Sequence, residues 1–426
     1  MAARSIAPNI GWLFLRFALR QGIQFIAFLL IARLASVEQF GLASVAIAVA
    51  MIARSMLQRG VRDLVLSRDF PYEEGGRAAA LLVNSLAGVL LAITLFSSAL
   101  ALWLMGPQSS FPAYLATAGL IPLVAGPSGI AEALIEKAFA HKQLSMAQAA
   151  ATLCGVIGGA WLALLGEGGW ALVVLSVGEA LVLCIILSLI SFRVRWRKLR
   201  WSLVAELARA AWPISVSFAV AGGGPRLAVI GVGVISGPVD AAQLRIAFQF
   251  FQTAVQLVAA PAAQILLPAL ATDRPSLASS SQRAMALMSA VLFPAFIFGG
   301  YWVSSLIPFL LGDAWSSAGP TSAVLFFGVF STVLFQIVVP VSLLSSRPLQ
   351  GSLLNMGRVA VSVAAAGTAA AWLGTGAALA YTVSSLLFIP LGMRLIKNGS
   401  TLTLRSQLHA VGPAAFGGVM SAWLLR

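Results

Sequence analysis

Seven arginines lie within or at the edges of long apolar segments, where an isolated charge is costly. They are Arg16, Arg20, Arg54, Arg209, Arg226, Arg245 and Arg358. An arginine at mid-bilayer costs at least about 2.5 kcal/mol, so such a residue usually faces a cavity or a binding partner. The planar guanidinium matches two phosphate oxygens better than it matches a neutral or cationic solute. The expected cargo is therefore anionic, with phosphate the best candidate.

Depth separates these arginines into two groups. Arg16, Arg209 and Arg358 lie near predicted segment ends, so their charges could reach the membrane surface along the flexible side chain. For these three, that simpler interpretation stays open. The deeper group, which we expect to face a cavity, consists of Arg20, Arg54, Arg226 and Arg245.

Few carboxylates are available to neutralise the deeper arginines. Glu179 is the one acid that we expect deep within an apolar segment, while Glu206 and Asp240 fall near segment starts. Pairing with acids therefore explains only a minority of the arginines. The interior of the predicted membrane region is strongly cationic.

Glutamines share helix faces with several arginines. Positions three, four or seven apart lie on one face of a helix. The resulting stripes are Arg16, Arg20 and Gln24; Arg54 and Gln58; and Arg245, Gln249, Gln252 and Gln256. Hydrogen bonding between packed helices is the competing explanation for the glutamines, and it does not account for Arg245 as readily.

The elements that must position these residues are transmembrane helices. The chain has 426 residues, of which 60% are hydrophobic and only 9% charged, whereas an ordinary soluble domain is about 25% charged. This composition excludes a soluble enzyme, a secreted disulfide scaffold and a disordered chain. Apolar windows of about 20 residues, enough to cross a bilayer, recur throughout. Twelve are predicted, at 11–33, 40–60, 78–105, 112–135, 145–166, 169–191, 203–235, 240–270, 285–311, 319–344, 350–373 and 375–396, with a shorter thirteenth candidate at 409–425.

Basic residues predict which loops face the cytoplasm. With the N-terminus inside, the cytoplasmic loops and the N-terminus hold 18 Lys and Arg, and the opposite side holds Arg33 and Arg426 only. This asymmetry is that of the positive-inside rule. The sequence therefore predicts a multi-pass protein with a cytoplasmic N-terminus.

Two equal sets of six segments flank the basic stretch 193–200. We expect an N-terminal lobe at 1–192, a cytoplasmic linker at 193–202, a C-terminal lobe at 203–397 and a tail at 398–426. A shift of 202 positions aligns Val37-Glu38 with Val239-Asp240, as a duplicated transporter requires. In the seventh segment, Gly222 to Pro225 precede Arg226, which predicts a helix broken beside a substrate path or, alternatively, a simple kink.

Several local patterns resemble one known family. They are Ala32-Arg33-Leu34 followed by Glu38-Gln39-Phe40-Gly41, the stretch 166–173 preceded by 136–139, Leu266 to Leu270, and Leu311 to Trp315. In order and spacing they resemble the polysaccharide transporter family of oligosaccharide-lipid flippases, within the multidrug/oligosaccharidyl-lipid/polysaccharide exporter superfamily. The family commonly has an acidic residue before the basic residue of the seventh helix, where this chain has Pro225.

The resemblance implies an all-α membrane fold of two pseudo-symmetric six-helix bundles around a central cleft. It implies that the protein works by alternating access and moves an undecaprenyl diphosphate-linked oligosaccharide to the outer leaflet of a bacterial inner membrane. It also implies polysaccharide biosynthesis machinery as a partner. We expect Arg20, Arg54 and Arg245 to hold the diphosphate. Coupling to H⁺ or Na⁺ is a superfamily property, and Glu179 is the residue that we expect to carry it.

Three other functions are weighed against this one. A multidrug exporter of the same superfamily would need carboxylates within the membrane to bind its organic cations. A membrane glycosyltransferase or polymerase would want acids on long external loops, and the predicted external loops are short. A pure scaffold is the third. We predict no enzyme activity, no metal or cofactor and no nucleic-acid partner, since the histidines, His141 and His409, are isolated.

Overall fold

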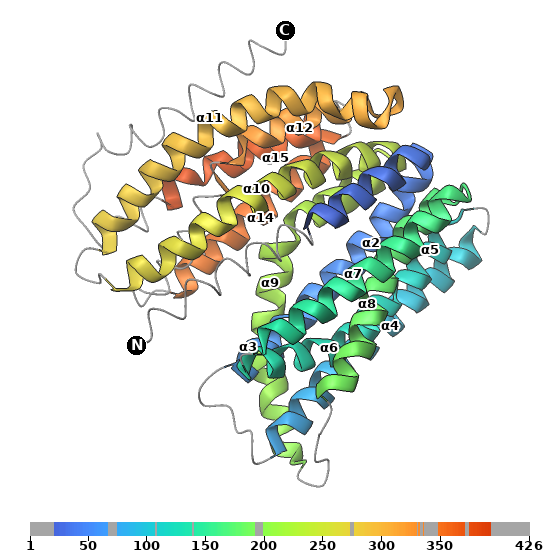
Figure 1. Cartoon of the computed structure of the whole chain (residues 1–426), viewed down its shortest axis with the longest axis vertical. Helices are drawn as coiled ribbons and strands as arrows, with labels where there is room; N and C mark the ends of the chain where they lie inside the picture. Colours follow the sequence, from blue (N-terminus) through green and yellow to red (C-terminus); the bar gives the residue numbers. More distant parts are fainter. Residues whose placement is uncertain are drawn as a thin grey trace. The chain divides into compact units, whose positions relative to one another are not determined.

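The computed structural model is an all-helical chain (Figure 1). It describes residues 21–66, 75–106, 109–138, 140–191, 199–272, 277–329, 331–332, 335, 348–370 and 375–392. Within these ranges, eight helices are long and apolar enough to cross a membrane, judged by length and composition. A helix suits this environment because its backbone groups bond to one another and none is left bare in lipid.

The described part of every one of the twelve predicted segments contains a helix. The N-terminal half has Gln21–Leu34, α2 (Val37–Leu57), α3 (Gly60–Leu66), α4 (Arg77–Met105), α5 (Phe111–Ala118), α6 (Leu120–Lys137), α7 (His141–Leu164) and α8 (Gly168–Ser191). The C-terminal half has α9 (Trp201–Ile235), α10 (Pro238–Thr272), α11 (Leu277–Leu311), the 3₁₀ turn η5 (Asp313–Trp315), α12 (Ala318–Phe327), α14 (Pro348–Ala370) and α15 (Gly376–Leu387). The candidate at 409–425 lies outside the described residues.

One predicted segment contains two helices. The fourth segment is divided at Gly119, whose N–H donates to the carbonyls of Leu115 and Ala116. This break leaves no trace in hydropathy, because the residues around it stay apolar. The helix of the second segment, α2, ends at Leu57, and a short helix, α3, begins at Gly60, the last residue of that predicted segment.

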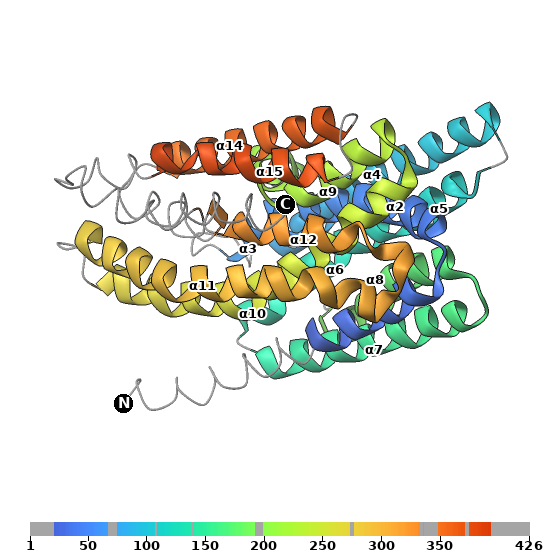
Figure 2. The same ribbon diagram turned by 90° about the horizontal axis from the view of Figure 1, so that it is seen from above.

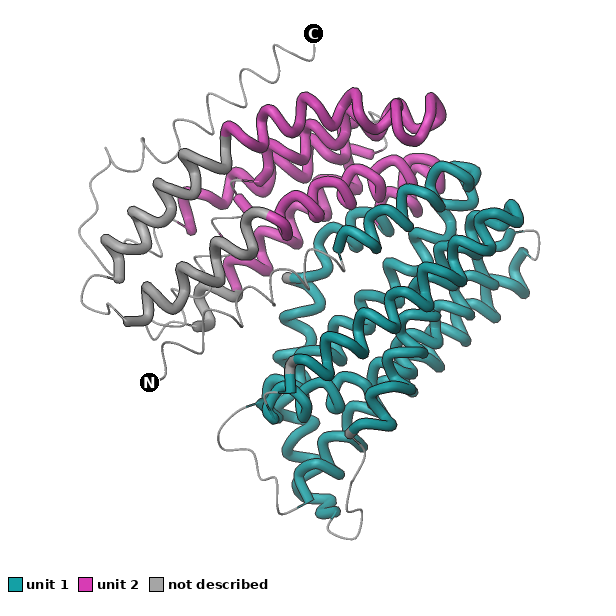
Figure 3. The backbone as a smooth tube through the Cα atoms, viewed as in Figure 1, with its two compact units in different colours: residues 1–230 teal, residues 231–426 magenta. Residues whose placement is uncertain are grey.

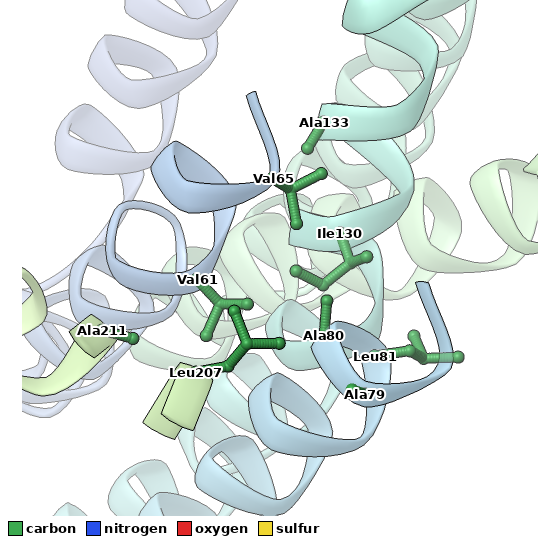
Figure 4. Packing of buried hydrophobic residues seen from close by; sticks show 9 residues of the cluster. All are labelled: Val61, Val65, Ala79, Ala80, Leu81, Ile130, Ala133, Leu207 and Ala211. Carbon is green, nitrogen blue, oxygen red and sulfur yellow. The ribbon is translucent and has the colours of Figure 1, made fainter. Parts of the chain in front are cut away.

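The helices form two compact units, residues 1–230 and 231–426 (Figure 3). The division falls inside α9, later than the predicted boundary at 193–202. The reason is that the first part of α9 packs on unit 1, where Leu207 and Ala211 join a core with Val61 of α3 (Figure 4). Its last residue, Ile235, instead contacts α14 of unit 2 at Gly367.

Unit 1 is held together by close helix contacts at small residues. A Cβ added at Gly155 of α7 would lie 2.6 Å from the Leu175 carbonyl oxygen of α8, and one at Gly159 would lie 2.8 Å from that of Ala171. Such small residues let membrane helices approach closely. The packing aligns α7 with α8 along their length, as Figure 1 shows.

Unit 2 has an aromatic core. Phe251 of α10 and Phe296 of α11 both pack against Phe326 of α12, with ring centroids 6.0 and 5.5 Å apart. Phe248 meets Tyr381 of α15 edge to face at 5.2 Å. These pairs link α10, α11, α12 and α15, while α14 lies beside α15 (Figure 2).

The exposed surface is apolar, as a lipid-facing surface should be. On α4, Leu86, Leu90 and Ile93 are 49%, 65% and 54% exposed. The opposite face of α4 buries small residues such as Gly88 and Ala92. This reverses the pattern of a soluble helix, because lipid, not water, covers the large side chains.

Candidate functional site

Arg54 of α2 and Arg226 of α9 lie in a part of unit 1 where these two segments approach each other. The Arg59 guanidinium carbon lies 4.9 Å from the Phe218 ring centroid, and a Cβ at Gly223 would lie 3.5 Å from Ile52. The charge of Arg54 is close enough to act on the guanidinium of Arg226. We call these two residues the arginine pair.

The arginine pair lacks an acidic partner within the described part of the chain. Neither side chain forms a salt bridge there, and both are half-buried. Each guanidinium carries five N–H donors and no acceptor. Two like charges in a partly desolvated place repel each other, and a multiply charged anion between them would replace that repulsion with attraction. The pair therefore has the chemistry of a site for phosphate or diphosphate.

The helix that carries Arg226 is continuous, so the predicted break is wrong. A single helix spans Trp201–Ile235 with Pro213 and Pro225 inside it. Pro225 has no N–H to donate to the carbonyl four residues earlier, and glycine costs a helix about 1 kcal/mol relative to alanine. The segment 222–225 therefore weakens α9 without interrupting it, and it does so directly before Arg226.

Gln24 and Glu179 are bonded to each other. The Gln24 amide Nε2 donates to Glu179 Oε2 at 2.7 Å, and Thr152 Oγ1 donates to Glu179 Oε1 at 3.4 Å. Glu179 is 7% exposed on α8, beside Gly155 of α7. We call Glu179, Gln24 and Thr152 the carboxylate cluster. Gln24 was predicted to share a substrate-binding face with Arg16 and Arg20, which lie outside the described residues.

A second carboxylate is buried in the same unit. Glu132 of α6 is 6% exposed, and it was not among the predicted residues. It lies one turn before Glu136, near the end of an apolar segment. The signal that could have found it is the run of small residues around it, Ala131 and Ala133, which packs tightly against neighbouring helices.

The stripe on α10 is a distinct half-exposed face of unit 2. Arg245, Gln249, Gln252 and Gln256 are all half-buried, while the residues between 241 and 255 on the other faces are buried apart from Ala254. Gln249 donates to Thr253 of its own helix at 3.4 Å. Gln243, outside the stripe, joins α10 to η5, because its Nε2 donates to the Ala314 carbonyl oxygen at 2.8 Å.

The interpretation that a charge reaches the membrane surface along its side chain fits Arg209 and does not fit Arg358. Arg209 is exposed on α9, as a residue that reaches the membrane surface should be. Arg358 is only 8% exposed. It donates to Ser385 Oγ at 2.7 Å and to Asn355 Oδ1 at 3.0 and 3.2 Å, and it stacks 4.7 Å from the Phe335 ring centroid. Arg358 therefore ties α14 to α15 through neutral groups.

The structure thus brings some of the predicted residues together and separates others. Arg54 lies within electrostatic range of Arg226, and Gln24 donates a hydrogen bond to Glu179, all in unit 1. Arg245, Gln249 and Gln252 belong to unit 2. Neighbours on different helices cannot be found from spacing along one helix, which is why the arginine pair was not predicted as a pair.

A family of polysaccharide biosynthesis proteins matches residues 30–320 of the chain. A search of curated proteins found none that matches. The family match covers both units and includes Arg54, Arg226, Glu179 and the α10 stripe.

Solved structures of transporters share the fold. The lipid II flippase MurJ, in an inward closed conformation, matches with a TM-score of 0.75 and 12% identity, covering 97% of this chain and 92% of that one. An inward-facing multidrug resistance MATE family transporter of the MOP superfamily gives 0.67 and 12%, covering 91% and 96%. A MOP superfamily transporter from Pyrococcus furiosus, described as having a binding pocket of reverse polarity, gives 0.57 and 13%, covering 98% and 96%. At these identities the likeness shows the fold.

Proposed function

The chain belongs to the family of polysaccharide biosynthesis proteins, and we propose that it is a flippase that moves an undecaprenyl diphosphate-linked oligosaccharide across a bacterial inner membrane. The observation that carries the proposal is the arginine pair. Arg54 and Arg226 are two adjacent cations with no acidic partner in the described part of the chain. A diphosphate is the group in this class of substrate that such a pair would bind.

We extend the proposal to the alternating access that the family resemblance implies. The lipid tail would stay in the bilayer while the glycan crosses the membrane in an aqueous path. Arg245, Gln249 and Gln252 would contribute from unit 2, because their face of α10 is not covered by the core of that unit. Arg16 and Arg20 stay predictions for the same path.

The carboxylate cluster is proposed as the coupling site for H⁺ or Na⁺. Glu179 already accepts hydrogen bonds from Gln24 and Thr152. A proton or sodium ion on this carboxylate would weaken those bonds and thereby change how Gln21–Leu34 packs on α7 and α8. That link between ion binding and helix packing is what an ion-driven flippase requires.

A second candidate function is export of an organic cation. The observation that favours it is Glu132, because two buried carboxylates, Glu132 and Glu179, are what a multidrug exporter uses for its cargo. Both acids accept cations, whereas the arginine pair repels them. The two functions therefore predict opposite ligand preferences.

Ligand-dependent thermal stability of the purified protein in detergent separates the two candidates. A ligand present at 100 times its Kd stabilises the folded state by about 2.7 kcal/mol. We expect stabilisation by an undecaprenyl diphosphate-linked glycan, a smaller effect of the monophosphate form, and loss of both in an Arg54→Gln, Arg226→Gln variant. Arg209→Gln, an exposed arginine of α9, is the matched control. Stabilisation by a quaternary ammonium compound that requires Glu132, with none by the diphosphate, would refute the flippase proposal.

A further inference from the structure

We infer that unit 1 holds a second lipid site, separate from the transport path, which binds the phosphate of an acidic glycerophospholipid from the surrounding membrane. The site is a cavity of about 480 Å³ at one end of the unit, formed by residues of α4, α6, α7 and α8. We call it the interfacial pocket. Its polar lining residues are Arg77, Lys137 and Gln143, and its larger apolar ones are Leu134, Ile135 and Ile190.

The pocket lies at the level where the membrane-crossing helices end. Four candidate membrane spans have one end around this pocket. Two of them begin there, at Arg77 and Lys142, and two end there, at Lys137 and Ile190. Four coincident span ends place the pocket at the boundary between hydrocarbon and water, where phospholipid headgroups lie. A soluble ligand would not need this depth.

The lining of the pocket is cationic. Arg77 and Lys137 both contribute, and no acid is among its lining residues in the described part of unit 1. Glu136, the acid next to Lys137 in the sequence, is paired with Arg62, whose Nη2 lies 2.6 Å from its Oε2. The Lys137 ammonium donates to the Val65 carbonyl oxygen at 3.1 Å, which fixes its position against α3. A phosphate at this site would meet two cations and the Gln143 amide.

An apolar track leads from the pocket onto the lipid-facing surface. Ile190, in the pocket wall, is 46% exposed, and the neighbouring Leu189 and Ile185 on α8 are 83% and 57% exposed. Ile185 and Leu189 are one turn apart, so they lie on the same face of the helix. An acyl chain attached to a phosphate in the pocket would have this face to lie along. The combination of a cationic end and an apolar track identifies a lipid, not free phosphate.

The floor of the pocket is part of a buried core. Ile135 belongs to a buried core cluster with Leu144 and Leu187, and Ala140 packs against the same cluster. A preformed floor reduces the entropy that binding must overcome. Acidic lipid at this position would hold the ends of α6, α7 and α8 together, and so stabilise unit 1.

The test is native mass spectrometry of the full-length protein in detergent, titrated with phosphatidylglycerol or phosphatidylcholine. A charge-assisted hydrogen bond of ordinary strength corresponds to about tenfold or more in Kd. We expect phosphatidylglycerol to bind more tightly than phosphatidylcholine, Arg77→Gln to weaken phosphatidylglycerol about tenfold, and Arg77→Lys to weaken it less. Arg209→Gln removes the same charge from an exposed arginine outside the pocket and should leave the Kd within about twofold.

A second arm distinguishes the source of the phosphate. Ile190→Ser should weaken phosphatidylglycerol and leave the weak binding of glycerol 3-phosphate unchanged, because it interrupts only the apolar track. Equal effects of Arg77→Gln and Arg209→Gln would overturn the site. Equal affinity for the two lipids would also overturn the site. A third contrary result would be displacement of phosphatidylglycerol by millimolar inorganic phosphate together with no effect of Ile190→Ser. Melting temperatures without added lipid show that each variant is folded, and Lys137→Gln provides an independent second loss of charge.

Discussion

Replacing Arg226 with alanine should have two opposite effects, on ligand affinity and on the stability of the empty protein. The charge of Arg54 acts on the guanidinium of Arg226, and neither residue has an acidic partner in the described part of the chain. Like charges repel each other, so removing one of them should leave the empty protein as stable as the wild type or slightly more stable.

The loss of affinity should be larger than this gain in stability. Hydrogen bonds to charged groups contribute about 1.5 to 3 kcal/mol, so Arg226→Ala should raise the Kd for a diphosphate-linked glycan about 10-fold to 150-fold. The empty variant should unfold at the same temperature as the wild type or slightly higher. Arg226→Lys should recover part of the affinity, because the charge returns without the planar pair of donors.

The assay combines lipid-glycan titration with thermal unfolding of the same detergent preparations. Arg54→Ala and the double variant complete a cycle, and the two single effects on affinity should not add, because both arginines bind one anion. Arg209→Ala is the control for loss of charge on α9. An empty Arg226→Ala protein destabilised by more than about 2 kcal/mol, with its Kd unchanged, would show that Arg226 is a packing residue and would refute the reasoning.

Three further changes probe other parts of the molecule. The structure has room for both methyl groups of a Gly222→Ala, Gly223→Ala double variant. This variant should stabilise α9 by about 1 to 2 kcal/mol and therefore raise the melting temperature. It should also slow transport, because it stiffens the helix before Arg226. Glu179→Gln should abolish stimulation of transport by an ion gradient while gradient-independent transfer persists; unchanged stimulation would exclude the carboxylate from coupling. Arg358→Lys should lower the melting temperature, because an ammonium cannot keep the geometry of three donated hydrogen bonds, and it should leave the Kd for the lipid glycan unchanged, since its contacts are within unit 2.

The membrane fold could be predicted from the sequence because it depends on the property that sequence displays best. Twenty apolar residues in a row are long enough to cross a bilayer, and each predicted segment contains a helix in its described part. The break at Gly119 could not be predicted, since it does not change the apolar character of the segment. The continuity of α9 through Pro225 was missed because proline and glycine usually end helices in water, whereas packing supports them in a membrane helix.

The arrangement of the candidate residues could be predicted along single helices but not between helices. Spacing along one helix correctly identified the half-exposed stripe that contains Arg245 on α10. It could not show that Arg54 lies beside Arg226 or that Gln24 bonds to Glu179, because these pairs depend on which helices pack together. Arg358 was placed near the surface by its distance from a segment end, but its neutral partners on α15 keep it buried.

The central claim is that the arginine pair engages the diphosphate during transport. The most direct measurement is leaflet transfer of a fluorescent undecaprenyl diphosphate-linked glycan in proteoliposomes, at equal protein levels, by the wild type and by Arg54, Arg226 and Arg209 variants. The account predicts transfer by the wild type and by Arg209→Ala, a reduction of at least about tenfold in Arg54→Ala and Arg226→Ala, and partial recovery in both lysine variants. Transfer at the wild-type rate by the protein that carries both alanines would contradict it.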